Sequence, residues 1–216
     1  MSVKVKICGI TDEAGLEAAV LSGADMVGFV FFPASPRFIT PERAAELIDM
    51  IDPESDVQVV GLFVDADDAM LSGVLPYVRL DMIQCHGKES PERVDAIRQD
   101  WALPVIKAIP VSTPEDLAAV DPYLGVADSL LFDAKPPKGA VLPGGNALSF
   151  DWTILSGKKW GMPWLLAGGL DPANVAEAIR ISGADAVDVS SGVESAPGKK
   201  DPARIKAFIE AAKSIR

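Results

Sequence analysis

The chain has 216 residues, of which 49% are hydrophobic and 24% charged, and this size and composition fit one globular domain with a full core. The net charge of −11 argues against a nucleic-acid partner, because such a partner requires a basic face. Two cysteines cannot build a disulfide framework, and no apolar run approaches the roughly 20 residues of a membrane span.

Short apolar, β-branched runs alternate with longer stretches in which apolar residues recur at helical spacing. The apolar runs predict strands at residues 3–8, 26–31, 57–64, 82–84, 105–108, 129–133, 164–167 and 186–189. Helices are predicted from Thr11 or Asp12 to 21, then over 41–50, 67–75, 90–99, 113–120, 152–156, 171–181 and 201–215. Eight strand–helix units in strict alternation predict a parallel sheet covered by helices and closed into a single-domain (β/α)8 TIM barrel over residues 1–216. An open, doubly wound sheet is the alternative.

Residues 134–149 interrupt this alternation, because they are rich in proline and glycine and follow the sixth predicted strand. Loops after strands carry the active site of a barrel, so we expect a mobile active-site loop here. A plain surface excursion is the alternative.

Polar residues at the ends of predicted strands are the candidates for chemistry. Cys8 ends the first strand, where it is either a buried structural thiol or a thiolate whose pKa is lowered by a nearby cation or helix N-terminus. Asp133 ends the sixth strand. It is either a helix cap or salt-bridge partner of Lys135, or a general acid with a pKa raised by partial burial.

His86 is the only histidine, and a lone histidine is more often structural than catalytic. A metal site of Cys8, Cys85 and His86 is not expected, because adjacent residues on a strand point to opposite faces. Arg37 follows the second strand, where it is either a solvated loop cation or a bidentate partner for a carboxylate.

Two short segments after the last two strands suggest a phosphate site. Gly168 and Gly169 follow strand seven, and Ser190 and Ser191 follow strand eight just beyond Asp188. Glycines allow the backbone to approach a phosphate closely, and hydroxyl groups add donors. An anionic substrate would need such a local feature, because the net charge of the chain repels it.

Together these segments resemble the phosphoribosylanthranilate isomerase family of tryptophan biosynthesis. The resemblance covers nearly the whole chain and rests on an ordered set of segments at successive strand ends. They are KICGIT at 6–11, SPRFI at 35–39, GLFV at 61–64, QCHG at 84–87, FDAK at 132–135, FDW at 150–152, LAGGL at 166–170 and DVSSGVE at 188–194. One departure is Cys85, where the family often has leucine.

The resemblance implies a (β/α)8 barrel that catalyses an Amadori rearrangement of N-(5-phosphoribosyl)anthranilate. It implies Asp133 as general acid and Cys8 as general base, with Arg37 on the anthranilate carboxylate. Gly168, Gly169, Ser190 and Ser191 would surround the phosphate. His86 and Asp188 match further polar positions of the family's site and would bind the substrate together with Arg37. No metal or organic cofactor is expected, because the iminium intermediate is itself the electron sink.

Other functions remain as alternatives. A bifunctional barrel for histidine and tryptophan synthesis commonly has an aspartate pair on strands one and five, where this chain has Cys8 and no aspartate at 105–108. A phosphate-binding barrel without turnover is the non-enzymatic alternative. We expect a cytoplasmic protein with a phosphorylated small-molecule substrate and no nucleic-acid or membrane partner. A monomer is expected, with a homodimer as the alternative.

Overall fold

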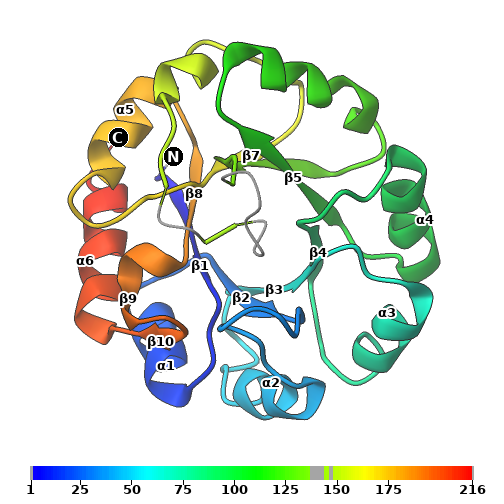
Figure 1. Cartoon of the computed structure of the whole chain (residues 1–216). Helices are drawn as coiled ribbons and strands as arrows, with labels where there is room; N and C mark the ends of the chain where they lie inside the picture. The colour runs from blue at the N-terminus through cyan, green and yellow to red at the C-terminus, as the bar shows by residue number, and fades with distance from the viewer. Residues whose placement is uncertain (1, 137–143, 146–147, 216) are drawn as a thin grey trace.

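Eight parallel strands form a closed barrel and follow one another around the ring in chain order (Figure 1). In this computed structural model, residues 2–136, 144–145 and 148–215 are described. The strands are β1 (Lys4–Cys8), β2 (Met26–Val30), β3 (Gln58–Phe63), β4 (Met82–Cys85), β5 (Val105–Val111), β6 (Ser129–Ala134), β7 (Trp164–Leu166) and β8 (Ala186–Val189). Because β8 pairs with β1, the ring closes and the predicted (β/α)8 TIM barrel is confirmed.

The strand predictions agree with the structure to within a residue, apart from β5. This strand continues to Val111 because it stays paired with β6, from Ile109 opposite Phe132 to Val111 opposite Ala134. The pairing depends on a partner that lies further along the chain, so the local pattern did not reveal it.

In the described ranges of the chain, six α-helices cover the outside of the barrel. They are α1 (Glu13–Leu21), α2 (Pro41–Ile48), α3 (Asp68–Val74), α4 (Pro91–Trp101), α5 (Val175–Ser182) and α6 (Pro202–Lys213). Side-chain caps begin most of them, as where the Asp12 carboxylate accepts a hydrogen bond from the Gly15 N–H at 2.8 Å. The predicted start of the seventh helix at Asp171 was wrong. The Asp171 carboxylate accepts from the N–H groups of Ala173 and Asn174 in a turn, and the helix begins only at Val175.

The segments that cover the barrel after β5 and β6 are not α-helices. This corrects the helices predicted over 113–120 and 152–156. The first consists of two 3₁₀ turns, η1 (Pro114–Ala119) and η2 (Asp121–Tyr123). Pro122 lacks the N–H that an α-helix would need, so one continuous helix cannot form there. The second is η3 (Trp152–Leu155), a 3₁₀ turn that is followed by Gly157 at a φ of +70°.

A short hairpin after β8 was not predicted. It follows the 3₁₀ turn η4 (Ser191–Val193) and consists of β9 (Glu194–Ala196) and β10 (Lys199–Lys200). Both strands are too short to produce an alternating pattern. The hairpin lies beside α1 and α6 at the rim of the barrel (Figure 1).

The strands bury two sets of side chains because successive residues point to opposite faces. The outward set packs under the helices in the largest core cluster. The inward set fills the barrel with a smaller cluster: Met26, Val60, Ile106, Ala108, Leu131, Leu165, Ala167 and Ala186. Towards the carboxyl ends of the strands the inward positions become polar, at Cys8, Asp133 and Asp188. The fold therefore collects these side chains at one mouth.

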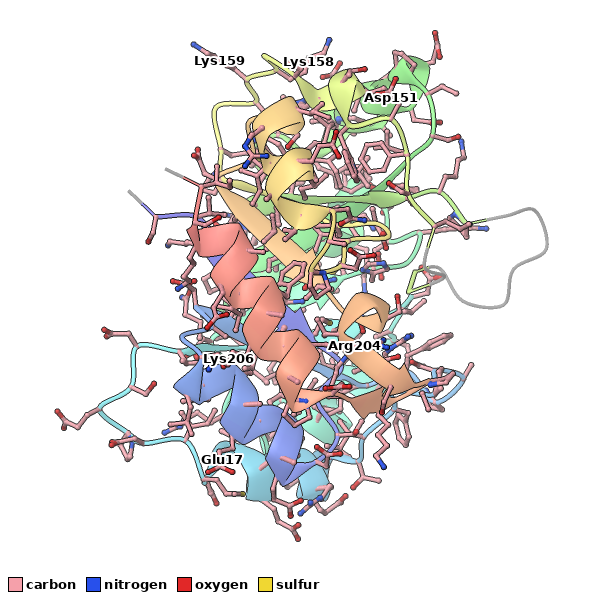
Figure 2. All side chains as sticks on the ribbon, turned by 90° about the vertical axis from the view of Figure 1, so that its left-hand side faces the viewer. Glu17, Asp151, Lys158, Lys159, Arg204 and Lys206 are labelled. Atoms are coloured by element: carbon pink, nitrogen blue, oxygen red, sulfur yellow. The ribbon has the colours of Figure 1, made fainter. Side chains whose placement is uncertain are left out.

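The flank of the barrel carries charged groups that face away from the core. Figure 2 shows α1 and α6 side by side, with Glu17 and Lys206 exposed on them. Among the described residues, no helix combines the length and apolar character needed to span a bilayer.

Candidate active site

One pocket at the carboxyl ends of the strands contains every residue that the sequence singled out. Its lining includes all nine predicted site residues: Cys8, Arg37, His86, Asp133, Gly168, Gly169, Asp188, Ser190 and Ser191. These residues come from strands or loops in both halves of the chain. The closed ring brings them together because the carboxyl ends of parallel strands face the same way.

Cys8 lies on the pocket floor beside a buried ion pair. Lys6 precedes it by two residues on the same face of β1, is fully buried, and donates to the Asp188 carboxylate at 3.0 Å. Asp188 faces Lys6 because these two residues are paired between β1 and β8. Gly28, opposite Cys8 on β2, leaves the room for both side chains. A Cβ there would lie 2.9 Å from Cys8 Sγ and 3.2 Å from Lys6 Nζ.

The charges around Cys8 act on its pKa in opposite directions. Burial raises the pKa of the thiol most strongly, Lys6 and Lys200 lower it, and the Asp188 carboxylate raises it. The net result is a pKa above the ordinary thiol value. Of the two alternatives for Cys8, the second thus has its nearby cation, but burial outweighs the effect of that cation on the thiol pKa.

Asp133 is held in a hydrogen-bonded chain that begins on β4. Its Oδ2 lies 3.2 Å from His86 Nε2, and the Gln84 side-chain amide donates to His86 Nδ1 at 2.7 Å. In this arrangement the ring proton of neutral His86 lies on Nε2 and points at the carboxylate. Lys135 pairs with Asp116 at 2.6 Å, so the alternative salt bridge between Asp133 and Lys135 is excluded.

Arg37 is not a solvated cation but a buried one. Its Nε and one terminal nitrogen donate to the two carboxylate oxygens of Glu194 at 2.7 and 2.9 Å. Glu194 thus occupies the bidentate edge that the sequence analysis assigned to a substrate carboxylate. The other terminal nitrogen, Nη1, faces Gly145 on the pocket wall, where a Cβ would come within 2.6 Å of it.

The phosphate candidates line the same pocket. Gly168 has a φ of +86° and lies so close to β6 that a Cβ would meet the Ala134 backbone nitrogen at 2.6 Å. Asn174 fixes the next residue by donating from its amide to the Gly169 carbonyl at 2.9 Å. The Lys200 ammonium lies 2.9 Å from the carbonyl oxygen and 3.2 Å from the hydroxyl of Ser190.

The prediction of an active-site loop at 134–149 falls partly outside the described residues, which omit 137–143 and 146–147. The described residues Gly144, Gly145 and Leu148 line the pocket. The loop therefore contributes to the pocket wall. Its motion stays a prediction.

Four buried polar residues around the pocket were missed as site residues: Lys6, Gln84, Glu194 and Lys200. For two of them the sequence held a signal, because Lys6 and Gln84 stand two positions before Cys8 and His86 on predicted strands. Residues at that spacing share a face. Glu194 and Lys200 gave no such signal, because their contacts depend on the hairpin.

The side chains of Cys85 and His86 point to opposite sides of the barrel wall, as predicted for adjacent residues on a strand. Cys85 is buried in the outer core, where burial and the Glu89 carboxylate raise its pKa to about 12, while His86 lines the pocket. In the described part of the chain, no three His, Cys, Asp or Glu side chains gather in a way that could hold a metal ion.

Another buried ion pair lies behind this site. Lys107 on the outward face of β5 donates to the Glu89 carboxylate at 2.6 Å and to the Gly87 carbonyl at 2.7 Å. Glu89 in turn accepts from the Gly87 N–H at 3.0 Å. The pair therefore anchors the loop that follows His86.

Comparisons with known proteins give one consistent result. The model of the N-(5'phosphoribosyl)anthranilate (PRA) isomerase family matches residues 5–211. A protein of Paramagnetospirillum magneticum named N-(5'-phosphoribosyl)anthranilate isomerase is 67% identical over 216 residues, which covers 100% of both chains. A crystal structure of phosphoribosyl anthranilate isomerase from Thermotoga maritima has a TM-score of 0.86 at 40% identity and covers 99% of this chain and 100% of its own. A further structure of such an isomerase, bound to reduced 1-(o-carboxyphenylamino)-1-deoxyribulose 5-phosphate, has a TM-score of 0.85, 40% identity and the same coverage.

Proposed function

The chain belongs to the N-(5'-phosphoribosyl)anthranilate isomerase family and is an isomerase of tryptophan biosynthesis, and from this premise we propose that it works by an acid–base Amadori rearrangement. The substrate carries a sugar ring, an aromatic carboxylate and a phosphate. In the proposed reaction the ring opens, a proton leaves C2′, and the product is an open-chain 1-(2-carboxyphenylamino)-1-deoxyribulose 5-phosphate.

Asp133 is the proposed general acid for ring opening. The C1′–O bond breaks when its electron pair goes to the ring oxygen, which must receive a proton to leave as a hydroxyl. After donation, Asp133 is a carboxylate that accepts a hydrogen bond from Nε2–H of His86, 3.2 Å away. This bond stabilises the charge that appears on Asp133, and Gln84 keeps the ring of His86 in the required tautomer.

Cys8 is the proposed general base for the second proton transfer. Ring opening leaves an iminium at C1′, which acidifies the C2′ proton, and the thiolate takes this proton to give an enolamine. The enolamine then tautomerises to the ketone, as C1′ gains a proton and the C2′ hydroxyl loses one. The raised pKa of Cys8 suits a strong base, but it lowers the ionised fraction at neutral pH. Lys6 and Lys200 oppose that effect, and the positive iminium would lower the pKa of the thiol further when substrate is bound.

Arg37 is the proposed partner of the anthranilate carboxylate. Nε and Nη2 of its guanidinium already donate to Glu194, so the substrate carboxylate would accept from Nη1, on the side of the pocket. A guanidinium has five N–H donors and can serve an internal and an external carboxylate at once. Asp188 has a different role in this proposal, because its pairing with Lys6 keeps that ammonium beside Cys8.

Gly168, Gly169, Ser190 and Ser191 are proposed to surround the phosphate. Together they present backbone N–H groups and two hydroxyls on the wall where phosphate sites of barrels are commonly found. We also propose that residues 1–216 act as one catalytic domain, because the acid and the base come from β1 and β6 of the same ring.

The observation that carries this proposal is that Cys8 and Asp133, from non-adjacent strands, line one pocket together with Arg37 and the glycine and serine residues. The experiment is a fluorescence time course of freshly prepared phosphoribosylanthranilate with purified protein. Loss of the anthranilate signal with formation of the ketose product is expected. Binding of substrate without product would instead favour a phosphate-binding barrel, and turnover of a second phosphosugar in addition to phosphoribosylanthranilate would favour the bifunctional alternative.

A further inference from the structure

The hairpin after β8 places a carboxylate and an ammonium behind both walls of the pocket. Glu194 and Lys200 belong to β9 and β10, are 6% and 3% exposed, and pair with each other at 2.9 Å. Lys200 approaches the pocket from behind and is not part of its lining, and the same holds for Glu194. Their burial needs an explanation, because the desolvation free energy of a buried ion pair is larger than that of an ion pair at the surface.

Glu194 connects this pair to Arg37. Each of its carboxylate oxygens accepts one guanidinium donor, and Oε1 accepts from Lys200 as well. One carboxylate thus lies between two cations, which compensates its burial and holds the guanidinium plane in one orientation. The pKa of Glu194 reflects this position, because Arg37 and Lys200 lower it although burial acts to raise it.

Lys200 connects the same pair to Ser190 in the part of the pocket that is lined by the phosphate candidates. Besides Glu194, its ammonium donates to the carbonyl and the hydroxyl oxygen of Ser190. An ammonium has three N–H donors, and these three oxygens use them all. The orientation of Ser190, a proposed phosphate contact, is therefore tied to the orientation of Arg37 through two side chains.

The hairpin is fixed in place from several directions. Its turn residue Gly198 donates to Glu194 Oε2 at 3.3 Å, and its carbonyl accepts from the Thr11 hydroxyl at 2.9 Å. Arg204 at the start of α6, labelled in Figure 2, donates to the Glu194 carbonyl at 2.6 Å. The pair therefore acts from a rigid support.

We propose that Glu194 and Lys200 are positioning residues that couple the carboxylate-binding wall of the pocket to the phosphate-binding wall. The inference rests on the proposed function for the identity of the two substrate groups. It adds that the two anion sites are not independent, because Arg37 and Ser190 are held by one buried ion pair. Loss of Lys200 should then weaken both sites at once.

The experiment uses calorimetric affinities, which do not depend on turnover, for three probes. They are anthranilate, inorganic phosphate and reduced 1-(o-carboxyphenylamino)-1-deoxyribulose 5-phosphate. In Lys200→Met we expect affinity for anthranilate and for phosphate each to fall about 10-fold, since each wall loses a charge-assisted hydrogen bond that orders it. Arg37→Met should weaken anthranilate binding alone. Lys200→Arg should recover most of the affinity, because it keeps the charge and the donors.

A control removes a partly exposed lysine that forms an ion pair at the other end of the barrel. Lys213 pairs with Asp25 at 3.0 Å and donates to the Gly23 carbonyl, so Lys213→Met should change stability but none of the three affinities. If Lys200→Met does not fold, Lys200→Gln is measured instead, with a smaller loss for both probes expected.

Each outcome tests one proposal. Unchanged phosphate affinity in the Lys200 variant, or a loss of stability with all affinities retained, would overturn the coupling. Failure of the wild-type protein to convert phosphoribosylanthranilate would overturn the proposed mechanism without deciding the coupling, which the affinities for anthranilate and phosphate test separately. Equal weakening of both probes by Lys200→Met, with recovery in Lys200→Arg, establishes the coupling.

Discussion

Lys6 and Cys8 project from the same face of β1, and the fully buried ammonium of Lys6 lowers the pKa of the Cys8 thiol that burial raises. Asp188, through its bond to Lys6, holds that ammonium in place and also acts directly on the thiol to raise its pKa. The reactivity of the thiol therefore depends on a balance among three buried groups. The pH dependence of turnover should report this balance.

Replacing either proposed proton-transfer residue should abolish most turnover without unfolding the barrel. Cys8→Ser and Asp133→Asn each remove a group whose acid or base action is worth about 10²–10⁴-fold, so kcat/KM should fall by that much. Far-ultraviolet circular dichroism should match that of the wild-type protein. Turnover within a few-fold of wild type in either variant would exclude the role assigned to that residue.

Cys85 provides the matched control for Cys8. It is also buried, but it faces the outer core instead of the pocket. Cys85→Ser should lower the melting temperature, because it buries a hydroxyl in apolar surroundings, and leave kcat/KM close to wild type. An equal loss of activity in both cysteine variants would point to damage to the fold.

The pH dependence of kcat/KM should follow the ionisation of Cys8. A base acts only when deprotonated, so the rate should rise with pH as the thiol ionises. Because burial places the pKa of Cys8 above its ordinary value of 9.0, the rise should continue into that alkaline range. In Lys6→Met the ammonium that lowers the pKa of the thiol is lost, while Asp188, which raises that pKa, remains. The rise of kcat/KM with pH should therefore move to still higher pH.

The thiolate absorbance of the protein measures the same ionisation without substrate. The pH at the midpoint of this absorbance change should also rise in Lys6→Met. The measurement is made in a protein that already carries Cys85→Ser, so that Cys8 is its only cysteine. If the rise of kcat/KM with pH stays at the same pH in Lys6→Met, this rise does not report the ionisation of Cys8.

The buried pair behind His86 should stabilise the protein in a pH-dependent way. Lys107 lowers the pKa of Glu89 below its ordinary value although burial acts to raise it. The stabilisation is therefore complete above the unfolded-state pKa near 4.5 and is lost as pH falls through the lower folded-state value. Glu89→Gln should lower the free energy of unfolding at pH 7 by about 3–5 kcal/mol, because it leaves Lys107 buried without a charged partner.

Urea unfolding at a series of pH values measures this effect. The difference between Glu89→Gln and wild type should be largest near neutrality and shrink below pH 4.5, where wild-type Glu89 also gains a proton. A difference that is constant with pH would show that the loss comes from packing and not from the ion pair.

The strand pattern was sufficient to predict the barrel and the location of its pocket. A buried parallel strand produces an almost continuous apolar run, and the polar residue that ends such a run must lie at one mouth of the ring. This logic identified Cys8 and Asp133 before any contact was known. The same logic failed after β5, where the apolar spacing resembled an α-helix but the chain forms two 3₁₀ turns.

The contacts that set the chemistry could not be predicted from the sequence. Lys6 pairs with a residue 182 positions away, and Arg37 with one 157 positions away. Both depend on the register of the closed ring and on the hairpin after β8, neither of which has a local signature. The direction of the Cys8 pKa shift depends on these contacts together with burial, so the sequence predicted a cation but not the outcome.

Adding one methyl group at Gly28 should damage the site selectively. A Cβ there would lie 2.9 Å from Cys8 Sγ and 3.2 Å from both the Cys8 Cα and Lys6 Nζ, inside ordinary contact distance. Gly28→Ala should therefore cost about 1–3 kcal/mol of stability by overpacking and displace the thiol. A displacement of 1 Å is enough to slow proton transfer by about 10²-fold, so kcat should fall more than KM changes.

The control is Gly73→Ala in α3, where a Cβ meets nothing within 4 Å, and this variant should keep its activity and gain up to about 1 kcal/mol of stability. If Gly28→Ala turns over normally, the close packing of Cys8 against β2 is not required for catalysis.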